Sequence, residues 1–155
     1  MNVTLIYVGS LKDQWIKEGC AEFEKRLSKY CSFSNVEIKQ EKLSSSPSEG
    51  EIAAALEKEA DAIIAAMPKK AMSVALCVEG KLYSSEELAE LIERQARDIV
   101  FIIGSTHGLS QRVKDMCGVK MSMSKMTLPH RMAKLFITEQ IYRAFNINAG
   151  SHYHQ

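Results

Sequence analysis

The sequence predicts an α/β fold in which a mostly parallel sheet is covered by helices on both faces. Segments with strand-like and helical patterns alternate along the chain, which is typical of parallel sheets. Two of the strand-like segments, residues 72–78 and 99–103, are continuously apolar, as expected for strands that are buried on both faces. A length of 155 residues suits one core, so we expect a single domain over residues 1–155.

The first half of the chain predicts two strands and two helices. Residues 3–8 are apolar and largely β-branched, which indicates a strand. Residues 14–30 carry their apolar side chains at helical spacing on one side, and residues 31–39 alternate as a strand does. Residues 51–67 are rich in Ala and predict a helix, which Pro68 ends.

The second half begins with the buried strand over residues 72–78, followed by a predicted turn at residues 79–81. Ser84 and Glu87 have the spacing of a capping box and start a helix that we expect to end near Arg97. Three short elements then follow, a strand, a helix and a strand, over residues 99–103, 110–117 and 119–123.

The last predicted element is a long helix that ends near residue 146. Thr127 has the right side chain to cap its start, and Pro129 suits its first turn. The tail beyond this helix has no regular pattern.

The composition is that of an ordinary globular protein, with 46% hydrophobic and 25% charged residues. The apolar start is too short to span a membrane and has no basic leader, so we expect a cytoplasmic protein without a membrane partner. The cysteines form no CxxC pair, so we expect reduced, packed thiols and no zinc site; they are Cys20, Cys31, Cys77 and Cys117.

The small net charge of +1 hides a division along the chain. Residues 111–155 carry seven Lys or Arg against two acidic residues, a net charge of 7 − 2 = +5. The remainder therefore carries 1 − 5 = −4. A basic end on a nearly neutral chain indicates one local anionic partner, although cations that gather at helix C-termini would give the same pattern.

Three loops should meet at one edge of the sheet, because ligands of parallel sheets bind beyond the carboxyl ends of the strands. They are residues 76–79, 104–108 and 123–128. Gly104 and Gly108 allow backbone to approach a ligand closely, although an ordinary turn explains them equally well. Neither GxGxxG nor a P-loop motif is present, so the sequence offers no phosphate-binding signature for a nucleotide.

The loop over residues 121–130 (MSMSKMTLPH) offers backbone hydrogen bonds and thioether side chains to an adenine ring, although a capped connector with core methionines is the simpler interpretation. In the tail, His152 and His154 flank Tyr153. These rings suit stacking on an unpaired base, whereas many chain ends are simply disordered. An HxH pair without an acidic or Cys neighbour does not indicate a metal site.

Together these segments resemble the RlmH-type pseudouridine N3-methyltransferases of the SPOUT superfamily, over the full length of the chain. The resemblance is carried by VTLIYVGSLK (3–12), AEFEKRL (21–27), SMSKMTLPH (122–130), EQIYRAF (139–145), Gly150 and Tyr153-His154. It implies a parallel-sheet SPOUT fold with a C-terminal trefoil knot and an obligate homodimer. It also implies S-adenosylmethionine (SAM) as the cofactor and N3 of a pseudouridine in 23S ribosomal RNA, on the assembled ribosome, as the methyl acceptor.

The resemblance also implies roles for individual residues. Cofactor contacts would come from Leu76, Gly104, Met123, Ser124, Lys125, Met126, Thr127 and Leu128. Catalysis would involve Arg143, His152 and His154, with His130 a further candidate for the general base. RNA would contact His130, Arg131, Arg143, Tyr153 and His154. The chain departs from the family at Ser105, where a second Gly is usual, and a side chain there would be expected to narrow the pocket.

Three other functions fit parts of the sequence. A different SPOUT methyltransferase would act on transfer RNA or on another ribosomal site, but the chain shows no additional RNA-binding domain. A non-catalytic ribosome- or RNA-binding module would keep the fold and lose cofactor binding. An unrelated α/β nucleotide-binding protein would need a phosphate motif that the sequence lacks.

Overall fold

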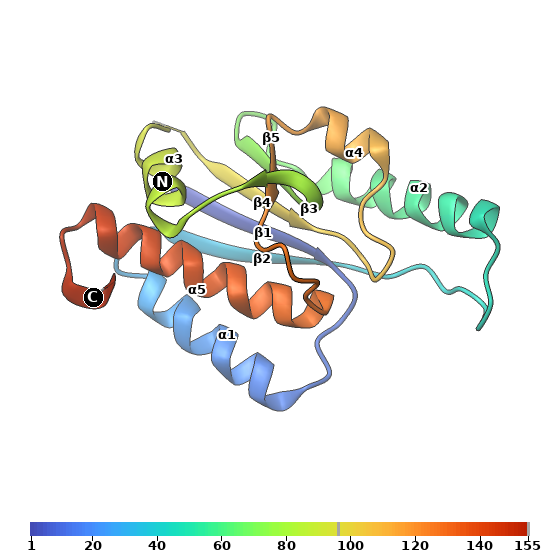
Figure 1. The fold of residues 1–155 in the computed structure, drawn as a ribbon, viewed down its shortest axis with the longest axis horizontal. Coiled ribbons are helices and arrows are strands. Elements are labelled where there is room, and N and C mark those ends of the chain that lie inside the picture. Colours follow the sequence, from blue (N-terminus) through green and yellow to red (C-terminus); the bar gives the residue numbers. More distant parts are fainter. Residues whose placement is uncertain (96, 155) are drawn as a thin grey trace.

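A five-stranded parallel sheet forms the centre of the protein, as the sequence predicted (Figure 1). The computed structural model describes residues 1–95 and 97–154. The strand order is β2-β1-β4-β3-β5, and every neighbouring pair is parallel. The strands are β1 (Asn2–Val8), β2 (Ser32–Ile38), β3 (Met72–Leu82), β4 (Ile99–Ile103) and β5 (Val119–Ser122).

Helices pack on both faces of this sheet. The helices α1 (Gln14–Leu27), α3 (Ser85–Glu93) and α5 (His130–Asn148) cover one face, and α2 (Glu49–Ala66) and α4 (Gln111–Met116) cover the other. Successive side chains of β1 and β4 point to opposite faces, because the side chains of a strand alternate. Leu5 and Phe101 therefore pack under α3 and α5, whereas Ile6 and Ile102 pack under α2 and α4.

Two helices begin with a complete capping box. Ser84 accepts a hydrogen bond from the backbone of Glu87, whose carboxylate accepts one from the Ser84 backbone, which confirms the predicted start of α3. Ser48 and Glu51 make the same pair at α2, so this helix begins at Glu49, before the predicted residue 51. The predicted end of α3 near Arg97 was wrong, because the helix ends at Glu93.

The predicted cap of the last helix was also wrong. Pro129, and not Thr127, is the N-cap residue of α5, and no side chain accepts a hydrogen bond there. The helix begins at His130 and continues to Asn148, two residues beyond the predicted end. A short 3-10 turn, η1 (His152–His154), follows it.

The turn predicted at residues 79–81 is instead the second part of a long strand. β3 continues to Leu82, and its register against β5 shifts between Leu76 and Lys81, which both pair with Met121. Gly80 makes this possible, since a Cβ there would lie 2.6 Å from the backbone N and C of Met121. The trefoil knot that the resemblance implies for the C-terminal part of the chain stays a prediction.

In the part of the chain that the structure describes, no helix is both long enough and apolar enough to cross a lipid bilayer. The same residues contain no group of three His, Cys, Asp or Glu side chains arranged to hold a metal ion.

Candidate functional site

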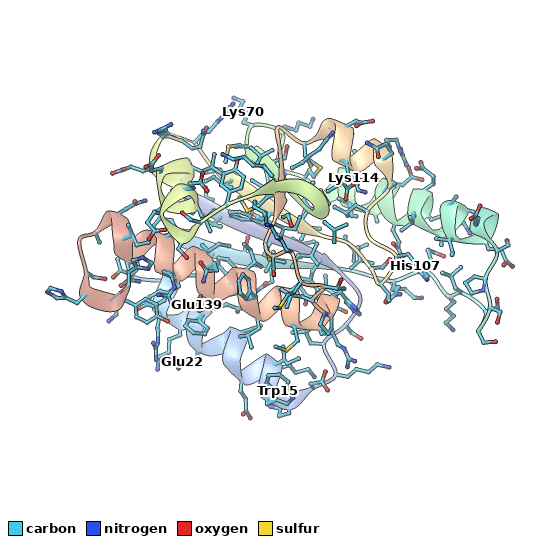
Figure 2. The ribbon with its side chains drawn as sticks, in the orientation of Figure 1. Trp15, Glu22, Lys70, His107, Lys114 and Glu139 are labelled. Carbon is cyan, nitrogen blue, oxygen red and sulfur yellow. The ribbon has the colours of Figure 1, made fainter. Side chains whose placement is uncertain are left out.

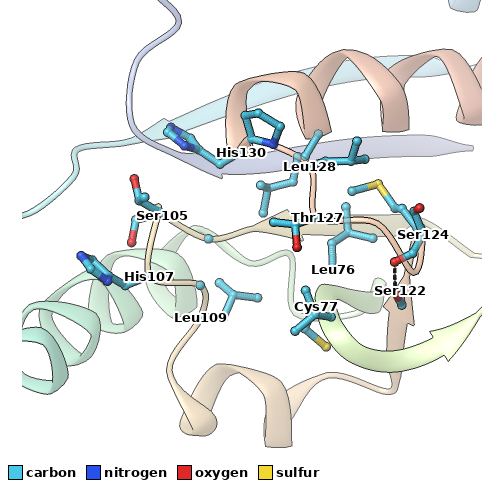
Figure 3. A pocket seen from close by; sticks show the side chains of 18 of the residues that line it. Leu76, Cys77, Ser105, His107, Leu109, Ser122, Ser124, Thr127, Leu128 and His130 are labelled. Atoms are coloured by element: carbon cyan, nitrogen blue, oxygen red, sulfur yellow. Dashed lines mark hydrogen bonds between the residues drawn. The ribbon is translucent and has the colours of Figure 1, made fainter. Parts of the chain in front are cut away.

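A pocket of about 680 Å³ opens beyond the carboxyl ends of β3, β4 and β5 (Figure 3). Its walls come from residues 76–79 after the first part of β3, residues 103–109 after β4, and residues 122–131 between β5 and α5. Figure 3 shows Leu76 of β3 and the consecutive residues Thr127 and Leu128 among the side chains that line this space. We call it the three-loop pocket.

Most residues that the resemblance assigned to the cofactor line this pocket. They are Leu76, Gly104, Met123, Ser124, Met126, Thr127 and Leu128. Lys125 is the exception, since it does not line the pocket and is exposed. The parallel topology accounts for the convergence, because β3, β4 and β5 are neighbours in the sheet and point the same way.

Gly104 is required by its own loop. A Cβ at this position would lie 2.8 Å from the Leu109 nitrogen and closer still to the Gly108 carbonyl group. The loop closes as a tight turn in which the Gly108 N–H donates to the Ser105 carbonyl at 2.8 Å, with Gly108 at a φ of +83°. The turn by itself therefore requires a glycine at position 104, and the cofactor contact at Gly104 stays a prediction.

A buried carboxylate lies behind the same loop. Glu59 of α2 is only 4% exposed, and it accepts a hydrogen bond from the Glu41 backbone N–H at 3.1 Å. Burial raises the pKa of Glu59, and the Glu41 N–H and the nearby Ser105 hydroxyl oppose the rise. Ser105, the residue that departs from the family pattern, lines the pocket, and its hydroxyl lies near the Glu59 carboxylate of α2.

Serine side chains shape the third wall. The Ser122 hydroxyl donates to the Ser124 carbonyl at 3.1 Å, which Figure 3 marks with a dashed line. The Ser124 hydroxyl in turn accepts from the Met126 N–H at 2.9 Å. These bonds hold the backbone of residues 122–126 in a compact turn, so the methionine-rich loop is ordered without regular secondary structure.

One charged residue of the pocket, Lys114, was not singled out by the sequence. Lys114 of α4 pairs with Glu79, and this ammonium group lowers the pKa of the Glu79 carboxyl. His107 and His130 also line the pocket. Burial, with a smaller effect of the neighbouring Arg131, lowers the pKa of His130, so its imidazole is neutral near pH 7 and can accept a proton. Lys114 lies on a separate helix, far from Glu79 in the sequence, so no local sequence pattern indicates that it reaches the pocket.

The residues predicted for catalysis form a separate cluster at the other end of α5. Arg143 pairs with Glu139 at 2.6 Å and lies 4.8 Å from the centre of the Tyr153 ring. The Tyr153 hydroxyl donates to Glu139 at 3.1 Å, and His154 lies 2.7 Å from the Glu86 carboxylate. We call these residues, with the exposed His152, the tail cluster.

The tail cluster does not reach the three-loop pocket of its own chain. The pocket touches α5 at His130, Arg131 and Ala133, whereas the tail follows Asn148. The tail turns back along α5, since Tyr153 contacts Glu139, and at about 1.5 Å per residue the six steps from Ala133 to Glu139 span about 9 Å. Figure 2 labels Glu139 of α5 and His107 in the loop after β4, which lie apart in this view. Gln155 lies outside the described residues.

Comparison with known proteins places this arrangement in a family. Residues 1–154 match a family model described as "Predicted SPOUT methyltransferase". The proteins named ribosomal RNA large subunit methyltransferase H from Latilactobacillus sakei and Clostridium novyi are 43% and 42% identical, and each alignment covers 100% of both chains.

Solved structures share the fold at low sequence identity. A probable methylase family protein from Haemophilus influenzae has a TM-score of 0.54 and 14% identity, over 99% of this chain and 70% of its own. A tRNA (m1G37) methyltransferase from Aquifex aeolicus has a TM-score of 0.57 and 13% identity, over 92% of this chain and 70% of its own. The full-length family match and the 43% identity to a curated relative together show that the chain belongs to the SPOUT methyltransferase family.

Proposed function

We propose that this protein is a SAM-dependent ribosomal RNA methyltransferase that modifies N3 of a pseudouridine in helix 69 of 23S ribosomal RNA. The observation that carries the proposal is the convergence of three loops, distant in sequence, on one pocket at the end of a parallel sheet. The names of the full-length relatives support the ribosomal substrate, and the resemblance supplies the pseudouridine. Because ribosomes are the substrate, we expect the protein to work in the cytoplasm.

The chemistry of the pocket fits SAM. A volume of about 680 Å³ lies in the range of small-molecule sites, and the lining is mostly apolar. Leu76, Met123 and Leu128 offer apolar contact to an adenine ring, while loop backbone offers hydrogen bonds to its edge. Gly104 and the compact turn at residues 122–126 would present this backbone without intervening side chains.

The cofactor, when bound, supplies an electrophilic methyl group on a sulfonium. The N3–H proton of the acceptor must leave as the new N–CH₃ bond forms and the S–CH₃ bond breaks. His130 supports this step from within the chain, because it borders the pocket and is neutral near pH 7. Arg131, which pairs with Asp13 at 2.7 Å, would hold RNA beside it.

The tail cluster would have to act from a second subunit. None of the described residues of the tail cluster lines the pocket of the same chain, so the roles implied for them would require a second copy. We therefore propose a homodimer in which Arg143, Tyr153, His152 and His154 of one chain complete the pocket of the other. Ordered packing of the tail by Glu139 and Glu86 supports a functional tail over a disordered one.

Mass spectrometry of ribosomal RNA tests the reaction. Cells without the gene should lose one methyl group on one pseudouridine of 23S RNA, and purified protein with SAM should restore it on ribosomes but leave transfer RNA unmodified. A methylated product on transfer RNA alone would identify a different SPOUT enzyme. Absence of SAM binding in calorimetry would favour a non-catalytic module.

Mixing two inactive variants tests the shared site. Thr127→Trp fills the pocket from an exposed position, and deletion of residues 151–155 removes the tail. Each variant alone should be inactive, whereas a refolded mixture should recover about a quarter of the activity, since half of its dimers contain one intact site of two. Deletion that leaves full activity, or a mixture that stays inactive, would contradict the shared site.

A further inference from the structure

A second cavity, of about 540 Å³, lies beside the three-loop pocket at the carboxyl ends of β1 and β2. The two cavities share His130 and Arg131 at the start of α5, so a ligand that crosses this boundary would occupy both. The remaining wall comes from residues after β1 and around the end of β2, namely Gly9, Ser10, Lys12, Glu37, Lys39, Gln40 and Lys42. We call this cavity the basic cleft.

The lining of the basic cleft is strongly cationic. Lys12, Lys39, Lys42 and Arg131 line it, with Glu37 as the single carboxylate among the described lining residues. Arg131 already pairs with Asp13. Over residues 1–95 and 97–154, no carboxylate lies within 4.0 Å of the Lys12, Lys39 or Lys42 ammonium groups. These three ammonium groups therefore form no ion pair with the described residues.

The backbone brings these cations together from separate segments. Gly9 has a φ of +93°, and its N–H donates to the Ile38 carbonyl at 2.8 Å, which fastens the end of β1 to the end of β2. A Cβ at Gly9 would lie 3.1 Å from Gln40 Oε1 and 3.6 Å from His130 Nε2. Glycine at this position therefore lets the β2 segment and α5 approach each other, and the cleft lies between them.

This location is unexpected from the charge pattern of the sequence. Residues 1–110 carry a net charge of −4, yet they supply Lys12, Lys39 and Lys42 to the cleft. Three other cations of this region pair with acidic residues, namely Arg26 with Glu22, Lys81 with Glu87 and Arg94 with Glu90. The cleft is thus a local concentration of positive charge in an otherwise acidic part of the chain.

We propose that the basic cleft binds backbone phosphates of the substrate RNA next to the nucleotide that enters the three-loop pocket. The inference rests on the proposed function. Lysine ammonium groups are point charges that suit phosphate, and none of the described lining residues is Phe, Tyr or Trp, so the cleft favours the RNA backbone over stacked bases. Because His130 and Arg131 line both cavities, the methylated base would lie in the three-loop pocket and its flanking phosphates in the basic cleft.

The test pairs a cleft variant with a matched control. Lys39→Gln with Lys42→Gln removes two charges from the cleft, and Lys17→Gln with Lys25→Gln removes two exposed charges from α1, outside it. Ribosome methylation is measured at several salt concentrations, and SAM binding is measured by calorimetry. The cleft variant should bind SAM normally and lose about tenfold in kcat/KM for ribosomes at low salt. The slope of log kcat/KM against log salt concentration should become shallower by about 1.4 to 1.8.

The outcomes separate the two proposals. If wild-type protein methylates ribosomal RNA and both double variants lose activity equally, or neither does, the cleft proposal is overturned while the function stands. If wild-type protein does not methylate ribosomal RNA, the proposed function fails first. A photocrosslinker at Lys42 should attach to 23S RNA near the methylated nucleotide, and attachment only to a ribosomal protein would overturn the assignment to RNA.

Discussion

Gly104→Ala perturbs the site in a way that separates two explanations for this glycine. If Gly104 only gives room to the cofactor, a methyl group there should weaken SAM binding and leave stability unchanged. In the structure the added Cβ instead meets backbone atoms of residues 108–109, the Leu109 nitrogen at 2.8 Å among them. Backbone cannot move aside by a change of rotamer, so the whole turn must shift.

The size of that shift sets the expected effect. Ordinary contact begins near 3.4 Å, so the Leu109 nitrogen alone must move by about 0.6 Å (3.4 − 2.8), and the Gly108 carbonyl by more. Overpacking of this kind costs about 1 to 3 kcal/mol of unfolding free energy. Because the displaced turn is one wall of the three-loop pocket, we expect SAM affinity to fall about tenfold or more, equivalent to about 1.4 kcal/mol.

Urea unfolding and calorimetry with SAM provide the two measurements. Gly118→Ala is the matched control, since a Cβ there lies 3.9 Å from the nearest atom, the Ser73 carbonyl oxygen, and should change stability by less than about 0.5 kcal/mol. Unchanged unfolding free energy in Gly104→Ala would refute the steric argument. Loss of SAM affinity at full stability would instead favour direct contact between Gly104 and the cofactor.

Three further predictions concern stability and thiol chemistry. Glu59→Gln removes a buried carboxyl whose pKa is raised in the folded protein. The unfolding free energy of the wild type, relative to this variant, should therefore fall as pH rises from about 4 through the raised pKa of Glu59. A difference in urea unfolding that does not change with pH would contradict this prediction. Ser84→Ala removes half of a capping box and should cost about 1 kcal/mol, whereas Ser44→Ala in the exposed loop before α2 should cost little. Burial raises the pKa of Cys31 to about 11, so its thiolate fraction at pH 8 is about 100-fold below that of an ordinary thiol. Labelling of Cys31 by iodoacetamide, followed by mass spectrometry, should therefore become fast only in urea. Rapid labelling of the native protein would show that Cys31 is not buried in this way.

The sequence by itself determined the elements and their layers. Continuous apolar runs at residues 72–78 and 99–103 predicted strands covered on both faces, and the Ser84–Glu87 spacing predicted the start of α3. These features depend on local burial and local hydrogen bonds, which leave a period or a spacing in the chain. The meeting of the three loops followed as well, since parallel strands end at one edge of the sheet.

Only the tertiary structure decided which side chains from separate elements meet. The structure brings together residues that are far apart in the sequence: Glu59 near Ser105, Lys114 with Glu79, and the lysines that follow β1 and β2 beside Arg131. It also placed the tail cluster outside the lining of the pocket of its own chain, and it showed that residues 108–109 leave no room for a Cβ at Gly104. Such contacts depend on how the crossover connections bring separate elements together. No spacing of residues within a single sequence indicates which elements will meet.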